Sequence, residues 1–203
     1  AVGPDGQVYV VWSYDEKLYF DRSEDQGVTW LSPDLEIGEQ IGGWAIDVEG
    51  LYRANGMPIT AVDLSDSPYK GTIYVNYCDQ RHGADDTDVW LLKSTNKGKT
   101  WSEPIRVNDD PPGKQQFFTW MSVDPVTGAI YIVFYDRRHY DDTQTDVYLA
   151  YSFDGGETFI NRRISDQPFV PMSSVFFGDY NNIAAYDGKI RPIWTRMDEG
   201  KTS

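Results

Sequence analysis

A short segment that occurs three times constrains the fold of this chain more than any other feature. Its copies are "SEDQGVTW" at residues 23–30, "STNKGKTW" at 94–101 and "SFDGGETF" at 152–159. A segment repeated in this way is more typical of repeated architecture than of a single catalytic centre.

The segment belongs to a longer repeated unit. The stretches "GTIYVNYCDQRHGADDTDVWLLKS" and "GAIYIVFYDRRHYDDTQTDVYLAYS" precede its second and third copies, and both contain Gly-x-Ile-Tyr, Asp-x-Arg-His and Thr-Asp-Val-x-Leu. In the third unit, short β-type runs such as "TWMSVD", "AIYIVFYD", "TDVYLAYS" and "NRRISD" alternate with turns and polar loops. Four antiparallel strands in a meander form one propeller blade, so we expect an all-β fold of four-stranded blades.

The repeated segment is expected to join the third and fourth strands of each blade. Its Asp or Asn can accept hydrogen bonds from nearby backbone N–H groups, its Gly can take the positive φ of a tight turn, and its aromatic ring can pack between strands. The residues assigned to this structural role are Ser23, Asp25, Gly27, Trp30, Ser94, Asn96, Gly98, Trp101, Ser152, Asp154, Gly156 and Phe159.

All of residues 1–203 are expected to form part of one β-propeller domain. The predicted parts are a blade at 1–40, an inter-blade insertion at 41–58, blades at 59–110 and 111–168, and a partial blade at 169–203, expected to hold two strands and the start of a third. Propellers typically have about 4 to 8 blades, so we expect a segment of a longer propeller of about six blades, or a part completed by other copies. The insertion "IGGWAIDVEGLYRANGMP" is long enough to suggest function.

The pattern Ser-x-Asp-x-Gly-x-Thr-Trp resembles the Asp-box, or bacterial neuraminidase repeat, of sialidases and related propellers. It is whole in the first copy, whereas Asn96 replaces Asp in the second and Phe159 replaces Trp in the third. The resemblance implies a sialidase-like β-propeller; it does not fix activity, because such propellers differ in function. Sialidases use an arginine triad, a Tyr nucleophile paired with Glu, and an Asp acid/base; the Phe-Arg-Ile-Pro signature that carries their first arginine does not occur in this sequence.

Candidate functional residues are expected at the end opposite the repeated turns, because a meander places second-to-third-strand loops and blade links together there. In "FFGDYNN", Asp179 could act as an acid or base and Tyr180 could stack or attack, so both are candidate catalytic residues. The predicted substrate-binding residues are arginines for an anionic sugar and aromatic or imidazole side chains: Arg81, Arg138, Arg196, His82, His139, Trp44 and Phe177.

Structural alternatives apply to most of these residues. Because Asp-x-Arg-His occurs in two blades, an Asp–Arg ion pair that braces the loop explains it as well as substrate binding does. Phe177 could instead pack a blade junction. No cofactor is required, although the carboxylates Asp85, Asp86, Asp141 and Asp142 are candidate Ca²⁺ ligands, with a solvated acidic loop as the alternative.

Composition narrows the class of partner. The chain has 32 acidic and 18 basic residues and a formal charge of −14, which disfavours nucleic acid and anionic membranes as partners, and it contains no apolar run long enough to span a membrane. We therefore expect a bacterial propeller that is secreted, periplasmic or on the cell surface and that engages a glycan or glycoconjugate, with exo-glycosidase or sialidase activity as one form. The alternative is a non-catalytic propeller that binds protein as a scaffold, adhesin or assembly factor.

Overall fold

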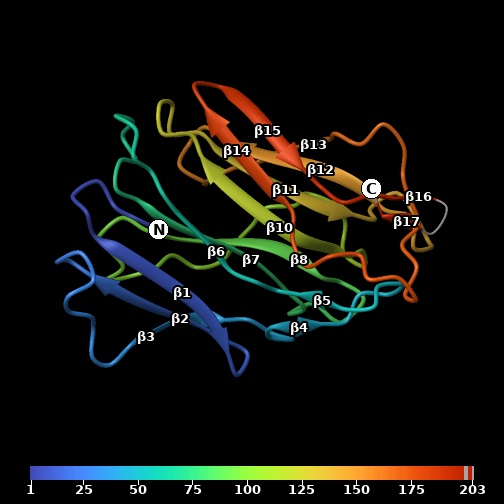
Figure 1. Cartoon of the computed structure of the whole chain (residues 1–203), viewed down its shortest axis with the longest axis horizontal. Coiled ribbons are helices and arrows are strands. Elements are labelled where there is room, and N and C mark those ends of the chain that lie inside the picture. The colour runs from blue at the N-terminus through green and yellow to red at the C-terminus, as the bar shows by residue number, and fades with distance from the viewer. Residues whose placement is uncertain (199–200, 203) are drawn as a thin grey trace.

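The described residues, 1–198 and 201–202, form strands, turns and loops and contain no helix. In this computed structural model the larger sheets lie side by side in chain order. The sheet that runs from β1 (Val8–Tyr14) to β3 (Leu35–Glu39) is at the lower edge of Figure 1, and the hairpin of β14 (Asn182–Tyr186) and β15 (Lys189–Ile193) is at the top. Each larger sheet is an antiparallel meander, as predicted for propeller blades.

Two sheets have four strands each and repeat the same register. The first contains β6 (Ile59–Val62), β7 (Ile73–Asp79), β8 (Asp88–Ser94) and β9 (Ile105–Arg106), and the second contains β10 (Gln116–Val123), β11 (Ile130–Asp136), β12 (Asp146–Ser152) and β13 (Ile160–Arg163). Every residue of β7 and β11 is buried. This agrees with the mostly apolar or aromatic residues on both faces of these strands: β10, for example, contacts β7 of the preceding blade as well as its own partner β11.

The remaining strands flank these two blades. A three-stranded sheet precedes them, an isolated bridge pairs Val2 with Val8 at its edge, and a hairpin follows them; the strands are β1 (Val8–Tyr14), β2 (Lys17–Ser23), β3 (Leu35–Glu39), β14 (Asn182–Tyr186) and β15 (Lys189–Ile193). The start of a third strand predicted after β15 does not join that hairpin: β16 (Met197–Asp198) pairs with β17 (Lys201–Thr202) instead. Residues 199–200 and 203 of the predicted partial blade lie outside the described residues.

The repeated turns have the hydrogen bonds that the sequence predicts. In the first copy, Ser23 Oγ accepts the Gly27 N–H at 2.7 Å and Asp25 Oδ1 accepts the Thr29 N–H at 2.8 Å. Gly27 has a φ of 93°. The other copies repeat this pattern, with Gly98 and Gly156 also at positive φ.

The glycine of each later turn also lies against the preceding blade. A Cβ on Gly156 would stand 2.6 Å from Leu91 Cδ2, and a Cβ on Gly98 would overlap the ring of Phe20. Trp101 lies edge-on to the same Phe20 ring at 5.1 Å. These turns therefore close a hairpin and pack one blade on the next.

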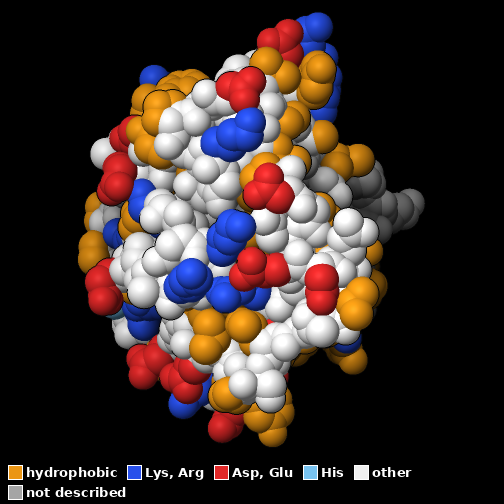
Figure 2. All heavy atoms as spheres, turned by 90° about the vertical axis from the view of Figure 1, so that its left-hand side faces the viewer, with side chains coloured by type: hydrophobic (Ala, Val, Ile, Leu, Met, Phe, Trp, Pro, Cys, Tyr) orange, Lys and Arg blue, Asp and Glu red, His pale blue; other side chains and the backbone are white. Residues whose placement is uncertain are grey.

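The two ends of the strands differ in content. The turns after β2, β8 and β12 lie at the left of Figure 1, whereas the link strands β4 (Ala45–Ile46) and β5 (Ala54–Asn55) lie toward the right. Figure 2 views the left-hand end, where acidic, basic and apolar side chains are intermixed. The opposite end carries the cavities described below.

Candidate functional site

The insertion at residues 41–58 crosses the end of the second blade. Gln40 anchors its start, donating from Nε2 to the carbonyls of Gly56 and Cys78. Gln80 Nε2 donates to the Asp47 carbonyl at 2.8 Å and to the Ala84 carbonyl at 3.1 Å, which ties the insertion to the loop between β7 and β8. The strands β4 and β5 then turn the insertion back on itself.

This path brings the insertion to the predicted catalytic segment. Arg53 forms a bidentate ion pair with Asp179, Nε to Oδ1 at 2.8 Å and Nη2 to Oδ2 at 2.6 Å. Asn55 Nδ2 donates to the Asp179 carbonyl at 2.8 Å. The Arg53 guanidinium also lies 5.3 Å from the centre of the Phe176 ring.

A cavity of about 280 Å³ opens beside this ion pair, lined among others by Trp44, Arg53, Asn55, Met57, Asp179 and Tyr180. Trp44 is 54% exposed and Tyr180 is 62% exposed. The Tyr180 ring also contacts Trp120, with ring centres 5.7 Å apart. Two exposed aromatic side chains beside fixed polar groups suit a ligand with both flat apolar and hydroxyl-bearing surfaces. We call this the Trp44 cavity.

The carboxylate of Asp179 is held in place rather than free. Its hydrogen bond and charge raise the pKa of Arg53, and the bidentate geometry is that of an ionised carboxylate. Both oxygens of Asp179 accept hydrogen bonds from Arg53 in this arrangement. Asp179 is the one carboxylate among the described residues that line this cavity, whereas hydrolysis of a glycosidic bond usually needs two carboxyl groups.

The structure supports the bracing interpretation of the Asp-x-Arg-His motifs. Arg81 donates from Nη2 to Asp79 at 2.6 Å and lies 4.1 Å from the centre of the Trp90 ring. In the next blade, Arg138 donates from Nε to Asp136 at 2.9 Å and lies 4.2 Å from the centre of the Tyr148 ring. Both guanidinium groups are thus held between a buried carboxylate and an aromatic ring, so their predicted role as substrate ligands gains no support from these contacts.

The two histidines have different partners despite their common motif. The Nδ1 of His82 lies 2.8 Å from Asp88 Oδ2, whereas the Nε2 of His139 lies 2.8 Å from the Tyr148 hydroxyl. Neither histidine lines the Trp44 cavity. The structure therefore places them in the loop framework rather than beside Asp179.

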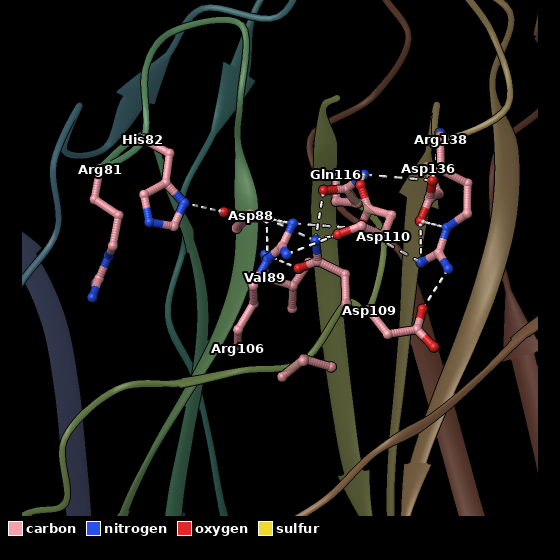
Figure 3. Close-up of polar contacts among 12 residues, drawn as sticks. Arg81, His82, Asp88, Val89, Arg106, Asp109, Asp110, Gln116, Asp136 and Arg138 are labelled. Atoms are coloured by element: carbon pink, nitrogen blue, oxygen red, sulfur yellow. Dashed lines mark hydrogen bonds and ion pairs between the residues drawn. The ribbon is translucent and has the colours of Figure 1, made fainter. Parts of the chain in front are cut away.

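A buried polar network, which the sequence did not reveal, connects the two four-stranded blades (Figure 3). Asn108 Nδ2 lies 2.7 Å from Asp88 Oδ1, 2.7 Å from Asp110 Oδ1 and 2.8 Å from Gln116 Oε1. Gln116 Nε2 in turn donates to Asp110 at 3.0 Å and to Asp136 at 3.5 Å. Burial raises the pKa of Asp136, although its ion pair with Arg138 opposes the shift. The run "VNDD" at 107–110 is the sequence feature that could have indicated this network, because three polar residues in it follow the end of β9.

Three further predictions, for Phe177, for Arg196 and for the Ca²⁺ ligands, gain no support from the structure. Phe177 is 4% exposed and stacks on Phe169 with ring centres 5.4 Å apart, so it is a core residue at the blade junction and not a substrate contact. Arg196 binds Asp198 at 2.9 Å and the Gln167 carbonyl at 3.0 Å, and it is not among the residues that line the Trp44 cavity.

The third of these predictions concerns the calcium ligands. No group of three or more His, Cys, Asp or Glu side chains among the residues that the structure describes is arranged to hold a metal ion. Asp86 is 5% exposed, whereas Asp141 is paired with Lys114 at 2.8 Å and Asp142 accepts the Gln144 N–H at 2.9 Å. Asp85 lines a separate cavity with Asp141 and Asp142. The expected Ca²⁺ site thus gains no support, because Asp86 is buried, Asp141 is ion-paired with Lys114, and the carboxylates that share the cavity are not arranged to hold a metal ion.

No protein-family model and no curated protein matches the sequence. Solved structures do match the fold. The α-L-arabinofuranosidase Arb93A from Fusarium graminearum has a TM-score of 0.55 at 15% identity over 91% of this chain and 50% of its own. The Hadza microbial sialidase Hz136 has a TM-score of 0.54 at 17% identity over 90% of this chain and 38% of its own. The NanB sialidase from Streptococcus pneumoniae has a TM-score of 0.51 at 13% identity over 99% of this chain and 27% of its own.

The chain has the fold of a sialidase-like β-propeller. It spans between 27% and 50% of the length of these three chains. The Trp44 cavity lies at the end of the strands that carries the link strands β4 and β5. The structure has no helix, among the residues it describes, that could cross a membrane.

Proposed function

We propose that this chain is part of a glycan-engaging, sialidase-like propeller whose sugar-binding site is the Trp44 cavity. The observation that carries the proposal is the convergence of Trp44 and Arg53, from the insertion, on Asp179 and Tyr180, which lie more than a hundred residues later. The sialidase and arabinofuranosidase neighbours support a glycan as ligand. A secreted or cell-surface bacterial location would agree with such a substrate.

The side chains of the cavity have separate roles in this proposal. Trp44 and Tyr180 provide faces for the apolar side of a sugar ring. Arg53 can exchange its hydrogen bonds with Asp179 for an anionic group of the ligand. Asp179 then acts as the base or electrostatic partner in a glycoside hydrolase reaction, and the second carboxyl group would come from outside the lining residues of this cavity.

Hydrolysis of fluorogenic sialosides and arabinofuranosides by the full-length protein tests the proposal. Asp179→Asn is expected to lower kcat by at least 100-fold, a loss typical of removing a proton-transfer group, while leaving the unfolding midpoint unchanged. Asp66→Asn is the matched control, because Asp66 is an exposed carboxylate that is also ion-paired, with Lys70 at 2.7 Å, and lies outside the cavity.

Turnover retained by Asp179→Asn would refute the catalytic role of Asp179. If the folded wild-type protein hydrolyses neither substrate, glycan binding should still be measured by calorimetry. If wild type binds a glycan and Trp44→Ala does not, the Trp44 cavity is a binding site without catalytic activity. If wild type binds no glycan, the result favours the alternative of a protein-binding scaffold.

A further inference from the structure

A second cavity, of about 460 Å³, lies at the same end of the strands and has a different chemical character. It is bounded by the insertion, by both second-to-third-strand loops and by the link before β10; the residues that matter here are Asp47, Glu49, Asp85, Lys114, Arg137 and Asp142. We call it the Arg137 pocket. Its volume is within the range of about 300–1,000 Å³ that is usual for small-molecule sites.

Arg137 is the unusual residue of this pocket. It is 4% exposed, and its polar contacts are with neutral groups: Nε donates to Thr145 Oγ1 at 3.1 Å and Nη1 donates to Gln115 Oε1 at 2.8 Å. Its Nη2 is buried without a hydrogen-bond partner, and no carboxylate oxygen of a described residue lies within 4.0 Å of the guanidinium. Arg81 and Arg138, in the same class of loop, both have such a carboxylate partner.

Burying the Arg137 guanidinium with an unpaired N–H group lowers the stability of the fold unless a ligand supplies the missing acceptor. Burial lowers the pKa of Arg137 to about 10, so the group remains a cation at neutral pH. Glu49 and Asp142 act on this cation through space, but no carboxylate contacts it directly. A buried cation without a contacting counterion is unfavourable, which makes Arg137 a candidate for a functional site. Nε and Nη1 already donate to protein groups, and a carboxylate oxygen is a strong acceptor for the guanidinium N–H groups that remain.

The rim of the pocket has the opposite charge. Asp47, Glu49, Asp85 and Asp142 line it, whereas the lysine that lines it, Lys114, is already paired with Asp141 at 2.8 Å. A ligand that carried negative charge alone would be repelled by these carboxylates. A ligand with a carboxylate and an ammonium group satisfies both the deep cation and the acidic rim.

We propose that the Arg137 pocket binds a small zwitterion, of amino-acid to dipeptide size, with its carboxylate toward the Arg137 side chain that lines the pocket and its ammonium group against the rim carboxylates. This site differs from the Trp44 cavity in position and in ligand class, and it does not depend on glycan binding there.

Calorimetric titration of the full-length protein with L-alanine and L-alanyl-L-alanine tests the proposal. At least one of them is expected to bind, and acetate and methylammonium, which each carry one of the two groups, are expected to bind at least 10-fold more weakly. Arg137→Met should abolish binding, whereas Asp179→Asn, in the other cavity, should leave it unchanged. No binding by either zwitterion, or equal binding of acetate or inorganic phosphate, would overturn the proposal.

Thermal unfolding without ligand provides a second test that does not require the correct probe. Arg137→Met keeps an unbranched apolar chain beside Phe117 and removes the buried charge, but it also removes the donors to Thr145 Oγ1 and Gln115 Oε1. These effects oppose one another, so the Tm is expected to change little. A fall in Tm of more than about 10 °C, which is about 3–5 kcal/mol for a domain of this size, would exceed the loss of these hydrogen bonds, assign Arg137 to the framework and overturn the ligand-binding role.

Discussion

Replacing Gly156 by alanine is expected to destabilise the protein by about 2–5 kcal/mol. Gly156 has a φ of 80°, where a side chain costs about 1–2 kcal/mol. The new Cβ would also lie 2.6 Å from Leu91 Cδ2 and 3.3 Å from Ile130 Cδ1. Both side chains are fully buried and cannot move freely, so overpacking adds about 1–3 kcal/mol.

Gly188→Ala is the matched control for this substitution. Gly188 has a φ of 71°, but nothing lies within 4 Å of the position that an alanine Cβ would take there, so only the backbone cost of about 1–2 kcal/mol applies. Urea unfolding followed by tryptophan fluorescence gives both free energies, provided that the m-values agree.

The contact between Gly156 and Leu91 of the preceding blade also predicts that substitutions at these two positions have coupled effects on the free energy of unfolding. Leu91→Val removes the Cδ atoms that the new methyl group would meet, so Gly156→Ala should cost less in that background. If Gly156→Ala destabilises no more than Gly188→Ala, or if the cost is the same in both backgrounds, the repeated turn does not pack blade on blade as we argue.

Two further predictions concern charge. Hydrogen bonds from Thr158 and Ser152 hold the pKa of Asp154 at about 2 against the effect of burial, so its contribution to stability is present above the ordinary value of 3.8 and is lost as pH falls through about 2. Asp154→Asn, which copies Asn96, should therefore flatten the pH dependence of the urea midpoint in that interval, and an unchanged slope would contradict this. Arg138→Ala should cost about 3–5 kcal/mol because Asp136 is fully buried, whereas Arg53→Ala, in a more exposed pair, should cost about 0–1 kcal/mol; equal losses in urea unfolding would refute the distinction.

The blades were predictable because their determinants are local. The hydrogen bonds of each repeated turn link residues two to four positions apart, as between Ser23 and Gly27, so the sequence displays all their partners. The Trp44 cavity was predictable only in part. Trp44, Asp179 and Tyr180 could be named, whereas the partnership of Arg53 with Asp179 depends on the path of the insertion over a neighbouring blade, and no local pattern encodes that path.

The histidines show how one residue changes the outcome of a repeated motif. In one loop Gly83 follows His82, and the imidazole reaches the buried carboxylate of Asp88. In the other loop Tyr140 follows His139, and the Tyr140 hydroxyl donates to the equivalent carboxylate, Asp146, at 2.9 Å.

Because Tyr140 takes Oδ2 of that carboxylate, His139 bonds instead to the hydroxyl of Tyr148, where the other blade has Trp90. Tyr140 also lines the Arg137 pocket, which Gly83 does not. The residue that displaces the histidine from the carboxylate thus also forms part of the wall of the pocket, so one sequence difference between the two loops changes both the brace and the cavity beside it.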